Sequence, residues 1–503
     1  MTVCVAAVDC GTSWTKGAVF DVRGELLGLA SRRTPSSTFS DGRVEVDLAR
    51  LSRAVFAVLR EAASRAGVRH SDVAGIAVTN QRATLVCYDR DGLPDGAGLS
   101  WQDLRGGPAL DCFEGRVSRK EFHQLTGLPL DPVFTVGKLA WLRKHQPERF
   151  SRAARFGLIQ DFVLGRLGAP TPGCDLSNAS LTGLLDLRTR SWSPAILEAL
   201  GLSPARLPAL VAPGRQVGVL GRTAASRTGL AEGTPLVSGG GDQQCAGLGA
   251  GAVQPGIVAI TLGTAAAPLC FTQRPALDPA VRVTCCVHAA PGTWEVEGLQ
   301  NSAGVCLEWL ARQVNGGRAL GPAFFAEVAA RRPGANGLLF LPYLAGASAP
   351  YWIPEATGTF LGLRLCHGKA DLARAVLEGV SLQTRAILEV FRSLDLPIRE
   401  VRLTGGGTAI AAWNQIQADL YGLSVATLAN PQATLLGAGI LATLGIGAHD
   451  SVAQATKAMI RTREQYDPEP GRVSEYDEVY RAYCSVHDGL TAGRVFARLT
   501  GRS

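Results

Sequence analysis

The chain has 503 residues, of which 46% are hydrophobic and 18% are charged. At about 150 residues per domain, this length allows roughly three domains or two larger lobes. The apolar fraction excludes an intrinsically disordered chain, and a chain of this size needs neither disulfides nor a metal to bury a core. The formal charge of +7 is spread over single basic residues. That pattern suits an anionic small molecule, and we expect no nucleic-acid partner.

The cysteines and the N-terminus indicate the cellular setting. The 12 cysteines show no C-x-x-C spacing, and most lie in apolar runs, so we expect buried, reduced thiols. Residues 1–8 lack a basic region and a cleavage site. No stretch approaches the ~18–20 apolar residues of a membrane span. We therefore expect a soluble, cytoplasmic protein without a membrane partner.

Strands and helices alternate in the first ninety residues. Apolar residues at helical spacing between 48 and 59 predict a helix. Short apolar runs predict strands over 3–8, 17–20, 26–30 and 74–78, the second and third forming a hairpin. This alternation indicates an α/β lobe.

A related opening recurs near the middle of the chain. Residues 256–262 are strand-like and end in Gly263-Thr264, and a short strand follows at 268–271. The second copy has Thr261 where the first has Asp9, so a duplication would have left two chemically unequal turns. We place the boundary between an N-terminal lobe, residues 1–248, and a C-terminal lobe, residues 249–503, in a glycine-dense stretch.

The second half contains a long predicted helix, residues 371–391, and a strand over 401–404 that runs into Gly405-Gly406-Gly407 before another helix. Glycine gives a ligand access to backbone N–H groups and to the helix start, so this order suits a phosphate or a nucleotide. With 59 glycines in the chain, the triple glycine alone is a weak signal.

The turn between the first two predicted strands, Gly11-Thr12-Ser13, is flanked by Asp9 and Lys16. It offers backbone N–H groups, hydroxyls and a cation to an anion, and Asp9 could hold a metal through water. It is not a Walker loop, because the G-x-x-x-x-G-K spacing is missing. An ordinary polar hairpin turn is the competing interpretation.

A lone carboxylate, Asp242, follows three glycines in Gly239-Gly240-Gly241 and precedes two glutamines. It can approach a ligand closely and act as general base on a hydroxyl. Its unperturbed pKa of about 3.9 makes it a weak base, which suffices for phosphoryl transfer because positioning dominates that reaction. A helix N-cap aspartate is the competing interpretation.

Residues 79–82 (Thr-Asn-Gln-Arg) and 101–103 (Trp-Gln-Asp) combine polar side chains with one tryptophan. A polyol site needs hydrogen bonds to hydroxyls and a flat apolar face against carbons. A loop with a satisfied surface arginine is the competing interpretation. The seven histidines show no metal-ligand spacing, so we assign them structural or surface positions. No serine lies in a G-x-S-x-G elbow.

In this order the motifs resemble the FGGY carbohydrate kinases, within the sugar kinase, Hsp70 and actin superfamily. The resemblance covers nearly the whole chain. Each motif is weak alone, but together and in the family order they are specific. Further segments that match the family's pattern are 175–180, 341–346, 358–363, 373–379 and 436–439.

The resemblance implies an α/β fold of two ribonuclease H-like (actin-like ATPase) lobes with ATP, Mg²⁺ and a small sugar or polyol in a central cleft. Asp242 would accept the proton of the attacking hydroxyl, and Asp9 would organise the waters around Mg²⁺. Lobe closure would exclude water from the transfer. The phosphates would be held by Thr12, Ser13, Lys16, Gly263 and Thr264. The adenosine side would be lined by Gly304, Glu308, Gly405 and Gly406. The sugar would contact Gln81, Arg82, Trp101, Asp242 and Gln243.

The substrate is less clear, because both specificity patterns are broken. Typical glycerol kinases carry a glutamate where Ala83 stands, a tyrosine where Val133 stands and an aromatic residue at Ala267. The xylulokinase pattern expects Met-His where the chain has Arg82-Ala83. The wider pocket and the xylulokinase-like run 260–264 favour a five-carbon ketose such as D-xylulose. Glycerol or another polyol is the alternative.

Two interpretations from other classes stay open. One is an ATP-driven switch like the chaperones and actin, which residues 79–82 and 101–103 argue against. The other is a non-catalytic protein that binds sugar and ATP, which the intact Asp242 and the two phosphate loops oppose. The sequence leaves the oligomeric state open, a homodimer being one option. It also leaves open whether Ile410, near the expected adenine position, alters the choice of nucleotide.

Overall fold

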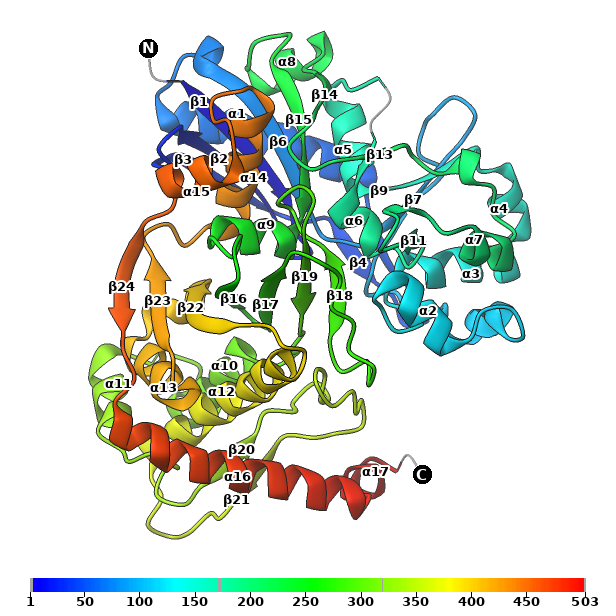
Figure 1. Ribbon diagram of the computed structural model, residues 1–503. Helices are drawn as coiled ribbons and strands as arrows, with labels where there is room; N and C mark the ends of the chain where they lie inside the picture. Colours follow the sequence, from blue (N-terminus) through cyan, green and yellow to red (C-terminus); the bar gives the residue numbers. More distant parts are fainter. Residues whose placement is uncertain (1–2, 171–172, 319, 502–503) are drawn as a thin grey trace.

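Two large sheets form the centre of the computed structural model, which describes residues 3–170, 173–318 and 320–501 (Figure 1). The first sheet has the order β14-β15-β6-β1-β2-β3 and the second β18-β19-β17-β16-β22-β23-β24. The first comprises β14 (Gln216–Val219), β15 (Pro235–Gly241), β6 (Val73–Asn80), β1 (Cys4–Cys10), β2 (Trp14–Asp21) and β3 (Leu26–Arg33). The second comprises β18 (Thr284–Val287), β19 (Trp294–Glu297), β17 (Ala266–Thr272), β16 (Gly256–Leu262), β22 (Ile398–Thr404), β23 (Ser424–Leu428) and β24 (Thr462–Tyr466).

The two sheets repeat one arrangement. Strands β1 and β2 are an antiparallel hairpin, and β6 runs parallel to β1 on its other side. In the second sheet β16 and β17 form the hairpin, and β22 runs parallel to β16. The sequence prediction of a recurring strand, turn and strand is confirmed. Each sheet thus places a hairpin turn beside the carboxyl ends of parallel strands, where ligands of open α/β sheets bind.

A smaller sheet, also built from the first half of the chain, lies on the right of Figure 1. Its core joins helix α3 (Thr135–His145) to helix α2 (Arg119–Thr126) and to helix α7 (Pro194–Leu200). The strand β8 leads directly into Trp101, so this sheet positions the expected sugar-side loop. Its strands are β4 (Ser36–Thr38), β5 (Val44–Val46), β8 (Gly98–Leu99), β7 (Leu85–Tyr88) and β9 (Arg155–Leu158).

Helices cover both faces of the first sheet. Helix α1 (Leu48–Ala66) begins at the N-cap Asp47, whose carboxylate accepts a hydrogen bond from the N–H of Arg50, and ends at Gly67 in the left-handed conformation. Its buried residues include every apolar position that predicted it. Helix α14 (Ala433–Gly445), far along the chain, packs on β1, β6 and β15 from the other side (Figure 1). The last part of the chain therefore completes the core of the first sheet.

Helix α9 (Asp242–Gly249) lies between the two sheets and crosses α14 at close range. A Cβ atom at Gly437 would lie 1.9 Å from the carbonyl oxygen of Cys245, and one at Gly249 would lie 2.0 Å from that of Ala433. Neither glycine can be replaced without moving a helix backbone. This contact fixes α9, and with it Asp242, against the first sheet.

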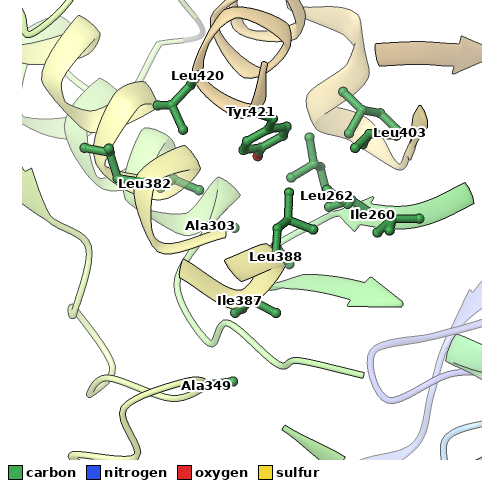
Figure 2. Close-up of a cluster of buried hydrophobic side chains, with 14 of the residues drawn as sticks. Ile260, Leu262, Ala303, Ala349, Leu382, Ile387, Leu388, Leu403, Leu420 and Tyr421 are labelled. Atoms are coloured by element: carbon green, nitrogen blue, oxygen red, sulfur yellow. The ribbon is translucent and has the colours of Figure 1, made fainter. Parts of the chain in front are cut away.

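The second sheet is covered by helix α12 (Lys369–Ser393), two residues longer at each end than the sequence predicts. Figure 2 shows Leu388 of this helix beside Leu262 of β16, and Leu382 and Ile387 belong to the same buried cluster. A 3-10 turn, residues 406–409, begins within the triple glycine, so the predicted helix begins only at Ala411 and runs to Tyr421 as α13.

Nine of the 12 cysteines are buried, as the sequence predicts, and Cys366 is exposed. Among the described residues, no helix combines the length and the apolar character that a membrane span requires.

Candidate active site

The first hairpin turn is held by its own backbone and by the strand that follows. The N–H of Gly11 donates to the carbonyl of Trp14 (3.1 Å), and the hydroxyl of Thr34 donates to the carbonyl of Gly11 (2.7 Å). Thr12 is half-buried and Ser13 is exposed. The Lys16 ammonium donates to Gln432, the N-cap residue of α14 (3.2 Å). The turn thus presents the hydroxyls of Thr12 and Ser13 and the cation of Lys16 at the sheet's edge.

Asp9 lies at the end of β1, opposite Lys16 on β2 and Thr79 on β6. Its Oδ1 atom is buried and has no hydrogen-bond partner among the described residues. Burial, and second the charge of Asp242, raises the pKa of Asp9 to about 7, against the opposing effect of Lys16. A buried carboxylate oxygen without a partner suits a hydrated cation, which would favour its charged form.

Asp242 follows β15, whose end pairs with Asn80 at the end of β6, so Asp9 and Asp242 stand at one edge of the first sheet. The N-cap of α9 is Gly241 and Asp242 is the first helical residue, so the N-cap interpretation is wrong. Asp242 Oδ1 accepts a hydrogen bond from the N–H of Gln243 (2.9 Å) and faces Arg82 Nε at 3.2 Å. Burial raises the pKa of Asp242 above its ordinary value, opposed by Arg82, and this makes it a better base than the isolated residue.

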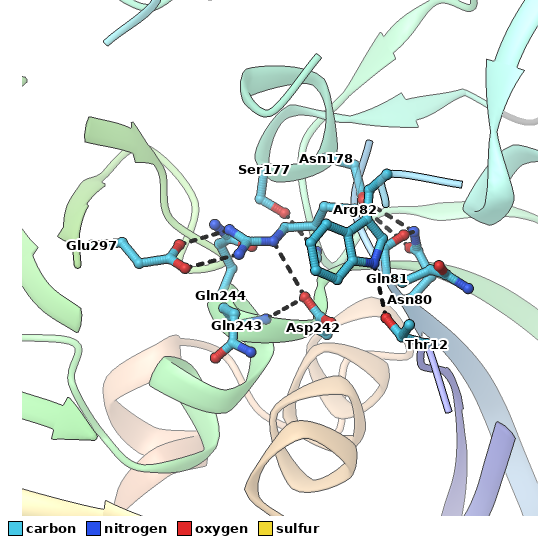
Figure 3. Close-up of polar contacts among 12 residues, drawn as sticks. Thr12, Asn80, Gln81, Arg82, Ser177, Asn178, Asp242, Gln243, Gln244 and Glu297 are labelled. Atoms are coloured by element: carbon cyan, nitrogen blue, oxygen red, sulfur yellow. Dashed lines mark hydrogen bonds and ion pairs between the residues drawn. The ribbon is translucent and has the colours of Figure 1, made fainter. Parts of the chain in front are cut away.

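Arg82 lies between Asp242 and Glu297, as Figure 3 shows. Its two terminal nitrogens donate to the carboxylate oxygens of Glu297, at 2.7 and 2.8 Å. Arg82 is satisfied, as the competing interpretation expected, but its side chain is only 15% exposed and it faces Asp242, so it is not a surface arginine. Gln81, just before it, is buried; its amide nitrogen lies 3.5 Å from the carbonyl of Gly11 and its amide oxygen accepts from Thr84.

The tryptophan loop reaches the first phosphate loop. The Trp101 indole N–H donates to the hydroxyl of Thr12 (2.9 Å). The carbonyl of Trp101 accepts from the buried ammonium of Lys138 (3.0 Å), which also donates to the carbonyl of Val133 (2.7 Å). Sequence reasoning missed Lys138, because nothing separates it from a surface lysine on a helix.

The matching segment 175–180 lies behind Asp242 rather than in contact with the expected sugar. Asp175 caps helix α6 (Leu176–Ser180) through the N–H groups of Ser177 and Asn178. The Asn178 and Asn80 side chains exchange hydrogen bonds at 3.1 and 3.2 Å. Ser177 Oγ accepts from the N–H of Gly241 (3.0 Å). This buried network supports the strand ends that carry Arg82 and Asp242 (Figure 3).

The second hairpin turn resembles the first and is held by helix α10 (Gly304–Asn315). The N–H of Gly304 donates to the carbonyl of Gly263 (2.9 Å), and that of Ala303 donates to the carbonyl of Thr264 (3.0 Å). A Cβ atom at Gly304 would lie 2.5 Å from the Gly263 oxygen. Gly263 and Thr264 are exposed; the N–H of Gly263 donates to the carbonyl of Ala265 (2.9 Å), and the Thr264 hydroxyl is available to a ligand.

Gly405 brings the triple glycine to the same turn. Its φ of +87° is left-handed, and a Cβ atom there would lie 2.5 Å from the carbonyl oxygen of Leu262. Gly406 is exposed at the start of the 3-10 turn, and Glu308 is exposed on α10 one turn beyond Gly304. Gln243 is half-buried beside Asp242. The structure therefore gathers the predicted residues at the two hairpin turns and at Asp242.

Three positions depart from the glycerol kinase pattern, and each carries a small or apolar side chain that is buried or half-buried. Ala83 is buried with a left-handed φ of +57°, Val133 is half-buried, and Ala267 is buried on β17 opposite Thr261. Among the described residues, no group of three His, Cys, Asp or Glu side chains is arranged to bind a metal on its own.

The family models that match this chain cover most of its length. The N-terminal domain of the FGGY family of carbohydrate kinases matches residues 4–249, and the C-terminal domain matches residues 258–446. The resemblance drawn from the motifs is confirmed.

Relatives carry two different names. The chain is 35% identical over 453 residues to a glycerol kinase of Trichlorobacter lovleyi, covering 88% of this chain and 90% of the relative. It is 28% identical over 486 residues to a xylulose kinase of Bacillus subtilis, covering 96% of both. Among solved structures, the xylulose kinase of Rhodospirillum rubrum superposes with a TM-score of 0.87 at 28% identity, covering 97% of this chain and 99% of that one. The two-lobed fold predicted from the sequence is confirmed, and the chain belongs to the FGGY family of carbohydrate kinases.

Proposed function

We propose that this protein transfers the γ-phosphoryl group of ATP to a hydroxyl of a small neutral sugar, preferably a ketopentose such as D-xylulose. The observation that carries the proposal is the placement of Asp242, a carboxylate with a raised pKa, beside Arg82 at the sheet edge that also holds the first phosphate loop. We keep residues 1–248 and 249–503 as the two lobes, and we propose that the protein works in the cytoplasm, where ATP is available.

In this mechanism the acceptor hydroxyl oxygen attacks the γ-phosphorus while the bond to the β-phosphate oxygen breaks and ADP leaves. Asp242 takes the hydroxyl proton, and its raised pKa brings it closer to the pH at which a base works. Lys16, Thr12 and Thr264 hold the phosphate oxygens through a charge and hydroxyls from two hairpins. Gly304, Gly405 and Gly406 leave room for the nucleoside.

Asp9 would hold Mg²⁺ through water, because its Oδ1 is buried and has no partner among the described residues. The bound ion would supply positive charge to the phosphate oxygens. For the chain's own residues, the proposal means that Asp9 is ionised in the working enzyme, although burial and the charge of Asp242 raise its pKa to about 7.

The charge around Arg82 supports a neutral acceptor. Both terminal nitrogens of Arg82 are paired with Glu297, and Nε faces Asp242. The Arg82, Glu297 and Asp242 side chains together carry a net charge of −1 when ionised, so a sugar acid would be repelled there. The small side chains at Ala83, Val133 and Ala267 favour an acceptor larger than glycerol.

Glycerol is the second candidate, because 35% identity to a glycerol kinase exceeds the 28% to a xylulose kinase. A coupled ADP-release assay with ATP and Mg²⁺ decides between them, using glycerol, erythritol, D-xylulose, D- and L-ribulose, L-fuculose and gluconate. We expect the highest kcat/KM with D-xylulose and none with gluconate. A preference for glycerol would replace the ketopentose, and ATP hydrolysis that ignores every acceptor would contradict a kinase.

A further inference from the structure

The guanidinium group of Arg82 joins three elements that are far apart in the sequence. Arg82 follows β6 of the first sheet, Glu297 ends β19 of the second sheet, and Asp242 begins α9. Glu297 binds both terminal nitrogens of Arg82, while Arg82 Nε faces Asp242 Oδ1 at 3.2 Å. The exposed side-chain fractions are 15% for Arg82, 5% for Glu297 and 25% for Asp242. Glu297 is thus buried behind the arginine, and Asp242 stands in front of it.

A two-pronged carboxylate contact fixes the plane of a guanidinium group as well as its position. Without it, Arg82 would regain side-chain freedom and turn its terminal nitrogens to the remaining carboxylate, Asp242. Asp242 would then bind the arginine through both of its oxygens. As the structure stands, Oδ1 accepts a hydrogen bond from the N–H of Gln243 and forms an ion pair with Arg82 Nε, and Oδ2 makes no hydrogen bond with any described residue.

We propose that Glu297 is a positioning residue for the transfer, which holds Arg82 so that only Nε faces Asp242 and Oδ2 stays open to the acceptor hydroxyl. The inference rests on the proposed function. The five N–H groups of Arg82 then have separate partners. Two bind Glu297 and one faces Asp242, and the remaining N–H on each terminal nitrogen is available to an oxygen of the acceptor substrate. Because Glu297 belongs to the second sheet and Arg82 to the first, the acceptor site is complete only when the two sheets are joined here.

The chain offers a matched control two residues earlier on the same strand face. Glu295 is fully buried, and its Oε1 accepts from Gln244 (2.6 Å) while Oε2 lies 3.7 Å from His288. It has no hydrogen bond or ion pair with Arg82 or Asp242 among the described residues. Glu295→Gln keeps the acceptor for Gln244 and removes a carboxyl group from the same strand without touching the Arg82 contact.

The test compares the purified full chain with Glu297→Gln, Glu297→Asp and Glu295→Gln, using ATP, Mg²⁺ and the acceptor that the wild type prefers. We expect Glu297→Gln to lower kcat about 10- to 100-fold with KM for ATP within about 2-fold, the scale of a disturbed general base. Glu297→Asp restores part of the rate, and Glu295→Gln stays within about 3-fold of the wild type. Equal losses in Glu297→Gln and Glu295→Gln would overturn the proposal.

A double-mutant cycle with Arg82→Lys separates positioning from a general packing effect. If Glu297 acts through Arg82, Glu297→Gln costs less than about 2-fold in kcat in the Arg82→Lys background; an undiminished loss overturns the proposal. Should the wild type turn over no acceptor, the proposed function fails by itself. The wild type, the two single variants Glu297→Gln and Arg82→Lys, and the double variant are then compared by their urea unfolding midpoints. Strictly additive shifts of the midpoint would show that Glu297 does not hold Arg82.

Discussion

The indole N–H of Trp101 donates a hydrogen bond to the hydroxyl of Thr12 across 2.9 Å. One partner belongs to the loop expected to face the sugar and the other to the loop expected to hold phosphate. Because a single hydrogen bond joins the two loops, the apolar ring against which a sugar would rest is placed with respect to the phosphate-binding turn. The acceptor and the donor are thereby aligned by the protein itself.

Trp101→Phe removes this N–H and keeps an aromatic face. We expect kcat/KM for the acceptor to fall about 2- to 10-fold, the worth of one net hydrogen bond. Thr12→Val costs more by itself, because it also removes a hydroxyl that the proposed mechanism places on phosphate, but the double variant should lose less than the product of the two single losses. Trp192→Phe is the control, since the Trp192 N–H donates to the carbonyl of Pro208 away from the site. Fully additive losses in the double variant would argue against the link.

Asp242→Asn should leave ATP and sugar binding largely intact and cut turnover at least ~10²-fold, the scale of a lost general base. An asparagine oxygen can still accept from Gln243 and face Arg82, so the local structure is kept. Single-turnover kinetics together with calorimetric binding of nucleotide measure the two effects. A variant with near-normal turnover would show that Asp242 is not the base.

Ala83→Glu combined with Val133→Tyr should shift preference toward glycerol. The pair restores the polar and aromatic groups that typical glycerol kinases carry, and Ala83 is already left-handed, so glutamate meets the same backbone requirement as alanine. The measurement is the ratio of kcat/KM for glycerol to that for D-xylulose. An unchanged ratio would count against a pocket widened at these positions.

Gly304→Ala should weaken ATP binding. Its methyl group would lie 2.5 Å from the Gly263 oxygen, so the second hairpin turn must move. We expect KM for ATP to rise roughly 10-fold, because a phosphate contact is displaced; this change corresponds to about 1.4 kcal/mol. KM for the acceptor should change little. Gly321→Ala, where a methyl group would meet nothing within 4 Å, is the control. Equal kinetics in the two variants would contradict the role of Gly304.

Asp161→Asn should make stability less dependent on pH. Burial raises the pKa of Asp161 to about 7, while the hydrogen bond from the N–H of Leu158 opposes the shift. Between about pH 4 and pH 7 the folded state holds a proton here that the unfolded state has lost, so this group's contribution to stability falls as pH rises and is gone above pH 7. Relative to the wild type, Asp161→Asn should gain about 2–3 kcal/mol between pH 5 and pH 8, at about 1.4 kcal/mol per unit. Urea unfolding at both pH values measures this, and an equal difference at the two would contradict it.

Local chemistry made much of the site predictable. Short glycine-containing segments indicate from their residue types alone that the backbone makes a tight turn or a close approach. They are the turns at Gly11 and Gly263, the glycines before Asp242 and the triple glycine. Gly405 is an example: its φ is left-handed, and a Cβ atom there would lie 2.5 Å from the Leu262 oxygen, so only glycine fits and the sequence shows it.

Long-range pairing was not predictable. Arg82 and Glu297 are 215 residues apart, and no periodicity links them. The only sequence signal was the presence of two glutamates, 295 and 297, on one face of a strand with a buried interior. Likewise, the apolar pattern of α14 predicts burial but cannot say that the helix packs on the first sheet rather than on the second.

The crossing of α9 and α14 has a mechanical consequence. At Gly249 and Gly437 the two backbones meet with no side chain between them, so α9 cannot slide along α14 without displacing a helix backbone. Helix α14 packs on β1, β6 and β15, and Asp242 is the first residue of α9, so the crossing ties the proposed base to the first sheet. Thr264 follows β16 and Gly406 follows β22, both strands of the second sheet. A change in the distance between the two hairpin turns would therefore come from movement of the second sheet, while Asp242 stays with the first phosphate loop.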